Sequence, residues 1–180
     1  EDLVKEYDLI FTGNMSYPPN VDSVAYLVNN VMPLVWKEKP EVKLIIVGAE
    51  PAAKVLKLKS KKVIVTGWVE SISPYYLKSK IFVAPMQIGT GLQNKLLEAM
   101  AMKLPCITSQ LANNALEATH NENILIGNTD EDYKNHIIKL IDDVDCQKRL
   151  AEKGYQFVKE NYTWEGSTSI LEKLISTSHK

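Results

Sequence analysis

The sequence predicts an α/β fold with a doubly wound, mainly parallel six-stranded sheet and helices on both faces. Short continuous apolar runs recur along the chain, as expected for strands that are buried on both sides. Segments with helical periodicity separate these runs. Four glycines, Gly13, Gly48, Gly67 and Gly89, stand at the carboxyl ends of expected strands. In a parallel sheet these turns meet at one edge, where ligands bind close to the point at which the strand order reverses.

Strands and helices are expected to alternate along most of the chain. The expected strands are residues 9–12, 42–47, 63–66, 81–84, 105–108 and 123–126. The expected helices are residues 21–38, 73–79, 130–144, 145–160 and 163–175 and a central helix that starts at Leu92, while 49–60 is a weak helix or a long loop. We expect Asn20 to cap the first helix, Pro33 to kink it, and Asn128-Thr129-Asp130 to supply cap residues before the helix at 130.

The composition is that of an ordinary globular domain, with 45% hydrophobic and 24% charged residues and a formal net charge of −1. This balance gives no electrostatic basis for binding nucleic acid. Arg149 is the single arginine, so phosphate contacts are expected from backbone N–H groups and lysine. The length of 180 residues predicts one domain that spans 1–180.

The cysteine content and the chain ends give expectations about the cellular context. Cys106 and Cys146 form neither a disulfide scaffold nor a CxxC metal motif, which favours a reducing cytoplasm. The sequence shows no signal-peptide pattern and no apolar run of about 18 residues. The chain lacks an initiator Met and opens on a polar lead into a strand. We therefore expect it to be a piece of a longer protein.

The stretch 89–101 is the strongest candidate for a ligand site. Gly89 and Gly91 permit a sharp turn after a strand and leave backbone amides unshielded. The N–H groups in the first turn of the following helix suit an anion. Lys95 and Glu98 lie on one side of this helix, which predicts a nucleotide site with the diphosphate at the helix tip and the ribose at the acid. The alternative is a solvated i,i+3 ion pair that binds nothing. The expected apolar face of the helix is formed by Leu92, Leu96, Ala99 and Met100.

Several segments, taken in order, resemble the carboxyl-terminal domain of family-4 (group 1) glycosyltransferases of the GT-B fold, which is Rossmann-like. The segments are FTGNMSYPPNVDSVAYL, KLIIVG, VIVTGWV, IFVAP, GTGLQNKLLEAMAMKLPCITS and ENYTWE. The similarity runs from about Tyr7 to Ile175 and is greatest to sugar transferases of bacterial polysaccharide assembly. The resemblance implies the donor-binding half of a retaining, hexosyltransferase-type enzyme. It would move a sugar from a nucleotide diphosphate-sugar to a hydroxyl acceptor, without a cofactor or a bound metal.

The resemblance also implies roles for particular residues. Lys95 would neutralise the leaving group and Glu98 would hold the ribose hydroxyls, so both are the catalytic candidates. The last helix would cross back onto an amino-terminal acceptor-binding domain that this chain lacks, and any membrane contact would come through that half. The expected location is cytoplasmic, with the inner face of the bacterial membrane as an option. The residues implied for the diphosphate are Gly13, Asn14, Gly89, Thr90, Gly91, Leu92, Gln93 and Asn94, and those for the base are Gly67, Trp68 and Val69.

The chain departs from the family pattern at three positions. Many relatives carry two acids eight positions apart, and Thr90 stands where the first would be. Asn14 and Asn20 occupy positions that are basic in many relatives. These departures leave two alternatives open: a non-catalytic GT-B-like binding or scaffold module, and an enzyme of this architecture that epimerises a nucleotide sugar. The isolated domain is expected to be inactive.

Other chemically suggestive residues have simpler explanations. Asp142-Asp143-Val144-Asp145 lies between two expected helices, where acids are ordinary caps rather than metal ligands. The histidines His120, His136 and His179 have no metal-like spacing, although His120 follows the fifth strand and could approach the site. Trp164 is expected to pack within the fold, and Trp68 either packs or borders the base.

Overall fold

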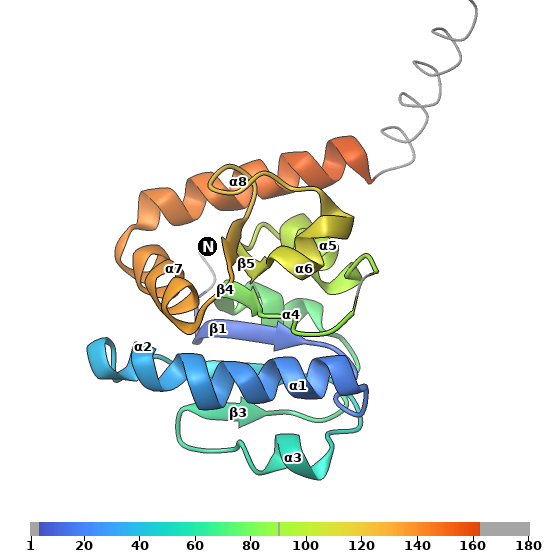
Figure 1. The fold of residues 1–180 in the computed structure, drawn as a ribbon, viewed down its shortest axis with the longest axis vertical. Coiled ribbons are helices and arrows are strands. Elements are labelled where there is room, and N and C mark those ends of the chain that lie inside the picture. The colour runs from blue at the N-terminus through green and yellow to red at the C-terminus, as the bar shows by residue number, and fades with distance from the viewer. Residues whose placement is uncertain (1–3, 90, 163–180) are drawn as a thin grey trace, which may run out of the picture.

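The computed structural model describes residues 4–89 and 91–162, and its centre is a six-stranded sheet (Figure 1). The strand order is β3-β2-β1-β4-β5-β6, and every strand pair is parallel. The expected fold class is therefore confirmed, with strand ends that differ by a few residues. The strands are β1 (Tyr7–Thr12), β2 (Leu44–Val47), β3 (Val63–Val65), β4 (Ser79–Ala84), β5 (Cys106–Ser109) and β6 (Leu125–Gly127).

The centre of the sheet is buried on both faces, which explains its unbroken apolar sequence. Ile10 of β1 lies between Ile45 of β2 and Phe82 of β4 in the strand register, and all three are fully buried. Phe11 stacks on Phe82, with ring centroids 6.5 Å apart. These central strands form the rigid base from which the turns at their carboxyl ends project.

Helices pack around the sheet in two groups. The helix after β1 runs in front of the sheet in Figure 1. It consists of α1 (Pro18–Tyr26), the π-helical segment η1 (Leu27–Val31) and α2 (Met32–Glu38). In the same group, α7 (Asp130–Asp142) packs against η1 and α2. In the other group, α5 (Asn94–Ala101) packs against α8 (Val144–Asn161). Three shorter helices are α3 (Ala53–Leu56), α4 (Ser73–Leu77) and α6 (Gln110–Leu116).

The first helix begins earlier than expected. It starts at Pro18, with Tyr17 in the N-cap position and no side-chain cap, so the expectation that Asn20 caps it is wrong. Proline is well suited to a first helical turn, and here Pro18 and Pro19 begin the helix. Asn20 is instead buried inside the first turn. A kink was expected at Pro33, and the structure has a π-helical segment, Leu27–Val31, that ends two residues before this proline.

Two helix starts follow capping rules, one of them unexpected. The side chain of Thr129 caps α7 in a capping box with Asp132, which confirms the expectation for that segment. Helix α6 was not expected, and Ser109 caps it by accepting a hydrogen bond of 3.2 Å from the amide of Ala112. The expected helix at 163–175 lies outside the described residues. Within the described part of the chain, no helix has the length and apolar character needed to cross a membrane.

Candidate functional site

A cleft of about 440 Å³ opens where the strand order reverses, beside the carboxyl ends of β1 and β4. Chain connections leave β1 and β4 in opposite directions along the sheet, so the turns that follow them separate and leave room for a ligand. The lining residues come from the end of β1, from the turns after β1, β2 and β3, from the first turn of α1, from the first two turns of α5, and from the region before α4. They are Thr12, Gly13, Asn14, Asn20, Gly48, Ala49, Trp68, Val69, Ile72, Asn94, Lys95 and Glu98.

Two glycine turns form the backbone wall of the cleft. Gly48 has φ of +154°, and a Cβ there would lie 1.7 Å from the carbonyl oxygen of Gly13. Gly13 has φ of +152°, and its Cβ would lie 2.6 Å from Nδ2 of Asn20. A hydrogen bond also joins the two turns: the amide of Met15 donates to the carbonyl of Ala49 at 2.8 Å. The absence of side chains lets the two turns approach closely and exposes backbone at the cleft.

Lys95 places an ammonium group in the cleft from the first turn of α5. Its Nζ donates to Oδ1 of Asn20 on α1 and lies 5.1 Å from the ring centroid of Phe11 in β1. Oε1 of Gln93 and Sδ of Met86 lie farther from Nζ, at 3.5 Å and 4.0 Å. Burial lowers the pKa of Lys95 from its ordinary value to about 8, and the negative charge of Glu98 partly opposes this shift. Lys95 is thus a half-buried cation that is mainly charged at neutral pH.

Glu98 lies one turn further along α5, and its exposed carboxylate accepts a hydrogen bond through one of its two oxygens. The buried phenol of Tyr76 in α4 donates to Oε2 of Glu98 at 3.1 Å. The oxygen of the same phenol lies 2.8 Å from Oγ1 of Thr12. Since a phenol has one proton, Thr12 is the donor to Tyr76 and Tyr76 is the donor to Glu98. Burial raises the pKa of Tyr76 well above its usual value, so the phenol keeps its proton.

Asn14 lies at the rim of the cleft, in a network of polar side chains. Its Oδ1 accepts hydrogen bonds from the amide and hydroxyl of Ser16, and its Nδ2 donates to Oε2 of Glu50 at 3.3 Å. Glu50 also accepts from the hydroxyl of Ser16 at 3.0 Å. The rim next to Gly13 is therefore polar and carries a carboxylate.

Trp68 is the large aromatic residue at the mouth of the cleft. It follows Gly67, whose φ of +82° belongs to a turn that a residue with a side chain rarely adopts. Trp68 exposes 75% of its surface, while its neighbour Val69 is half-buried. Within the described residues Trp68 does not pack into the core, and its indole ring is available to a planar ligand.

The structure brings together most, but not all, of the residues that the sequence singles out. Gly13, Asn14, Trp68, Asn94 and Lys95 line the cleft, as do Val69 and Glu98. The predicted residues outside its lining are Gly67, Gly89, Gly91, Leu92 and Gln93. Thr90 lies outside the described residues.

The central helix starts at Asn94 rather than at Leu92, which corrects the expected helix tip. Gln93 is the N-cap residue, with extended backbone angles, and its side chain donates to the carbonyl of Gly91 at 2.9 Å. Leu92 is 40% exposed and so does not belong to the apolar face. The amides of the first helical turn are consequently those of Asn94, Lys95 and Leu96, although Leu96 already donates to the carbonyl of Gln93.

Sequence reasoning missed several residues of this site. Thr12, Ala49 and Ile72 line the cleft, but no sequence pattern marks them as site residues. Tyr76 contacts the site through its hydrogen bond to Glu98. Nothing in the sequence around Tyr76 predicted this contact, because the residue is one aromatic side chain in a short helix. The position of Thr12, immediately before the first glycine turn, was the one clue available from the sequence.

Groups outside the cleft have structural explanations. Asp142 pairs with Lys39, and Asp143 caps α8 by accepting from the amide of Cys146 at 2.8 Å, so the acidic run behaves as caps and surface charge. His120 accepts from the amide of Ile126, away from the cleft. Cys106 and Cys146 are buried free thiols. The described residues contain no group of three or more His, Cys, Asp or Glu that could hold a metal ion.

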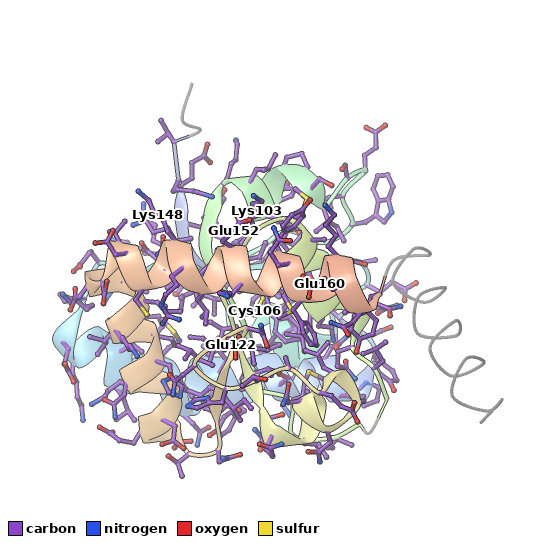
Figure 2. All side chains as sticks on the ribbon, turned by 90° about the horizontal axis from the view of Figure 1, so that it is seen from above. Lys103, Cys106, Glu122, Lys148, Glu152 and Glu160 are labelled. Carbon is purple, nitrogen blue, oxygen red and sulfur yellow. The ribbon has the colours of Figure 1, made fainter. Side chains whose placement is uncertain are left out.

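A larger groove of about 600 Å³ lies along α8 and the loop that contains Glu122 and Asn123. Figure 2 shows α8 nearest the viewer, with Lys148, Glu152 and Glu160 on it and Glu122 on the neighbouring loop. Lys103 from the end of α5 bonds Glu152 at 2.7 Å. The groove carries mixed charges and its lining includes no residue from the turns at the carboxyl ends of the strands, so the switch-point cleft is the stronger candidate for a ligand site.

The parallel sheet and its switch-point cleft define a doubly wound α/β domain, a class of fold in which ligands bind at the carboxyl edge of the sheet. The chain belongs to the group 1 glycosyl transferases, since the model of that family, described as "Glycosyl transferases group 1", matches residues 6–143. A protein of Klebsiella pneumoniae, described as an uncharacterized 44.6 kDa protein in the cps region, is 27% identical over 164 residues. That match covers 86% of this chain and 42% of the Klebsiella protein.

Two solved structures share the fold. A mutant of TarM from S. aureus, in complex with fondaparinux, α-GlcNAc-glycerol and UDP, superposes with a TM-score of 0.77 at 19% identity, over 98% of this chain and 36% of TarM. The carboxyl-terminal domain of a group 1 glycosyl transferase (LpcC) from Francisella tularensis superposes with a TM-score of 0.69 at 19% identity, over 89% of this chain and 88% of that one. The expected family and fold are confirmed. The chain spans less than half the length of the Klebsiella protein and of TarM.

Proposed function

We propose that this chain is the donor-binding half of a retaining glycosyltransferase that moves a sugar from a nucleoside diphosphate-sugar to a hydroxyl acceptor. The observation that carries the proposal is the cleft at the switch point, into which α5 presents both Lys95 and Glu98. An ammonium complements a diphosphate, and a carboxylate accepts hydrogen bonds from ribose hydroxyls. The TarM structure, which contains UDP, supports uracil as the first base to test.

The remaining assignments follow from the same arrangement. Gly13, Asn14 and Asn94, which line the cleft, would contact the diphosphate together with the first turn of α5. Trp68 and Val69, after Gly67, would border the base. We propose that donor binding needs neither a metal nor another cofactor, since the backbone amides of the first turn of α5 and the Lys95 ammonium would provide the positive charge.

Transfer would need parts that this chain does not supply. The cleft is open, and catalysis requires the donor to be covered, water to be excluded and an acceptor to be oriented. An amino-terminal acceptor-binding domain would do this, so the chain alone would bind a donor without transferring its sugar. The relative in the cps region supports a role in polysaccharide or glycoconjugate synthesis. We propose that the transferred sugar is a hexose. We infer a cytoplasmic location, with any membrane contact made by the amino-terminal half.

A second candidate is a nucleotide-binding module of the same family that does not transfer sugar. Among the described residues that line the cleft, Lys95 is the one cationic side chain, and the Asn14 amide is engaged by Ser16 and Glu50. Product analysis with the full-length protein separates the candidates. Transfer from any nucleotide sugar excludes the non-catalytic module, while conversion of the donor without an acceptor would indicate an epimerase.

Calorimetric titration of the chain with UDP and GDP tests donor binding. Two or three charge-assisted hydrogen bonds contribute roughly 1.5–3 kcal/mol each before ordering costs, so we expect a dissociation constant nearer millimolar than nanomolar. Lys95→Met and Glu98→Gln should each weaken binding about tenfold or more, since each removes a charged partner. Lys103→Met is the control, because Lys103 lies at the other end of the helix and pairs with Glu152. Absence of binding at millimolar nucleotide, or equal binding by all four proteins, would refute the assignment.

A further inference from the structure

We propose that Asn20 is a positioning residue that holds the Lys95 ammonium in the cleft by a neutral hydrogen bond and leaves its charge free for the diphosphate. Asn20 is 4% exposed and lies in the first turn of α1, 75 residues away from Lys95 in the sequence. The proposal rests on the proposed nucleotide binding and adds a residue that acts through Lys95.

The orientation of the Asn20 amide is fixed by its surroundings. Its Nδ2 donates to the backbone carbonyl of Asn14 at 2.9 Å. The missing side chain of Gly13 provides the space, because a Cβ there would lie 2.6 Å from this nitrogen. With Nδ2 committed to a carbonyl, Oδ1 must point the other way, and there it accepts from Nζ of Lys95.

The other contacts of Lys95 are too weak to define its position. Oε1 of Gln93 at 3.5 Å and Sδ of Met86 at 4.0 Å are long contacts, and the face of Phe11 attracts the charge without a directional hydrogen bond. Asn20 is therefore the contact that pins the end of a flexible four-carbon side chain. Lysine loses considerable rotamer entropy when fixed, so a ligand benefits when the protein has fixed it in advance.

The neutrality of Asn20 matters as much as its position. A carboxylate in its place would pair with Lys95, repel a diphosphate and lose the bond to the Asn14 carbonyl. Within the described residues that line the cleft, Glu98 is the other charged side chain, and Glu50 reaches the rim through Asn14. Both acids lie on other parts of the site, so the side of Lys95 that faces α1 meets a neutral partner.

A double-mutant cycle tests the coupling between the two residues. Asn20→Leu keeps the shape of the side chain and should weaken UDP binding about fivefold or more in the natural chain. In a Lys95→Met background the same substitution should change binding less than about twofold, because the side chain it positions is gone. Asn30→Leu, on the exposed side of η1, is the control for an asparagine-to-leucine change. Equal effects of Asn20→Leu in both backgrounds would overturn the proposal.

The pH profile gives a readout that a purely structural role would not move. In the natural chain, UDP affinity should fall as the pH rises through about 8, because Lys95 then loses its charge. Asn20→Asp should weaken binding about tenfold or more below pH 8 and shift the fall to higher pH, because its carboxylate raises the pKa of Lys95. Asn20→Leu should shift the fall to lower pH, since it removes a hydrogen bond that favours the ammonium. Asn30→Asp should change neither quantity.

The pKa of Lys95 can also be measured without a nucleotide, by NMR of the chain with labelled lysine. This separates the two proposals. If the natural chain does not bind UDP, the proposed function fails, but opposite shifts of the Lys95 pKa in Asn20→Asp and Asn20→Leu would still establish the positioning contact. An unchanged Lys95 pKa in both folded variants would overturn it, whatever binds in the cleft. Thermal unfolding checks that each variant is folded.

Discussion

At the scale of single residues, Trp68 is a large aromatic side chain that lies mostly in solvent. An indole that is 75% exposed gains little from packing, yet Trp68 borders the cleft. Trp68→Ala should reduce UDP affinity about 5- to 150-fold, because stacking of a base on an aromatic ring is worth roughly 1–3 kcal/mol. Trp68→Phe should keep most of the affinity. Calorimetry measures both, with Trp36→Phe as the control on α2, and unchanged binding by Trp68→Ala would place the base elsewhere.

Tyr76 gives a second prediction, which concerns how Glu98 is held. Tyr76→Phe removes the proton that the phenol donates to Glu98 and leaves the Thr12 hydroxyl without its acceptor. The free energy of unfolding should fall by about 1–3 kcal/mol, the cost of an unsatisfied buried polar group.

The same variant should affect ligands selectively. Affinity for UDP should fall a few-fold, while affinity for 2′,3′-dideoxy-UDP should hardly change, because Glu98 is proposed to bind the ribose hydroxyls. Tyr75→Phe, at the neighbouring half-buried position, is the control. An equal loss for both nucleotides would show that Tyr76 does not act through the ribose.

At the scale of secondary-structure elements, the turns after β1 and β2 depend on a missing side chain. Gly48→Ala would place a methyl group 1.7 Å from the carbonyl oxygen of Gly13, in a backbone region that L-residues rarely adopt. We expect a loss of at least about 1–3 kcal/mol in the free energy of unfolding, from crowding and strain together. Gly91→Ala should be nearly neutral, since a Cβ there meets no atom within 4 Å. Denaturant unfolding compares the two, and a similar stability would contradict the close approach.

The edge strand β6 provides a prediction about pH. Nδ1 of His120 accepts a hydrogen bond from the amide of Ile126, and the ring of His136 bonds the carbonyl of the same residue at 3.0 Å. Burial lowers the pKa of His120, and the charges of His136 and Lys139 lower it further, while Asp132 opposes them. His120 is therefore protonated more readily in the unfolded chain than in the folded chain.

It follows that the stability contributed by neutral His120 is complete above a pH of about 6.5 and declines as the pH falls through and below that value. His120→Ala should lower the melting temperature at pH 7.5 and flatten its dependence on pH between 5.5 and 7.5. Thermal unfolding across this range tests the prediction. A slope that persists unchanged in the variant would assign the titration to another group.

At the scale of the whole molecule, the sheet could be predicted from the sequence and the details of the cleft could not. Strands buried on both faces are continuous apolar runs, so β1, β2 and β4 were visible without any tertiary information. Gly13 and Gly48, which follow β1 and β2, also marked the edge of the sheet at which the cleft lies. Two local rules failed. Asn20 has the chemistry of a cap, but Pro18 and Pro19 begin the helix before it and its side chain bonds Lys95. Leu92 fits the helical periodicity, but the helix begins only at Asn94.

The whole chain also limits what its cleft can do. The residues that line the cleft lie at the end of β1, in the turns after three parallel strands and on α1 and α5, and the cleft is open to solvent. In fold, the chain matches 36% of TarM and 88% of the carboxyl-terminal domain of LpcC. We therefore expect nucleotide binding to survive in this chain and sugar transfer to require the rest of the protein.

The most direct test of donor binding is a crystal structure of the chain with UDP. The predicted result places the diphosphate between the Gly13 turn and the first turn of α5, within hydrogen-bonding distance of Nζ of Lys95. The ribose should lie at Glu98 and the base beside Trp68. An empty cleft at saturating UDP, or UDP bound in the groove along α8, would contradict the proposed function.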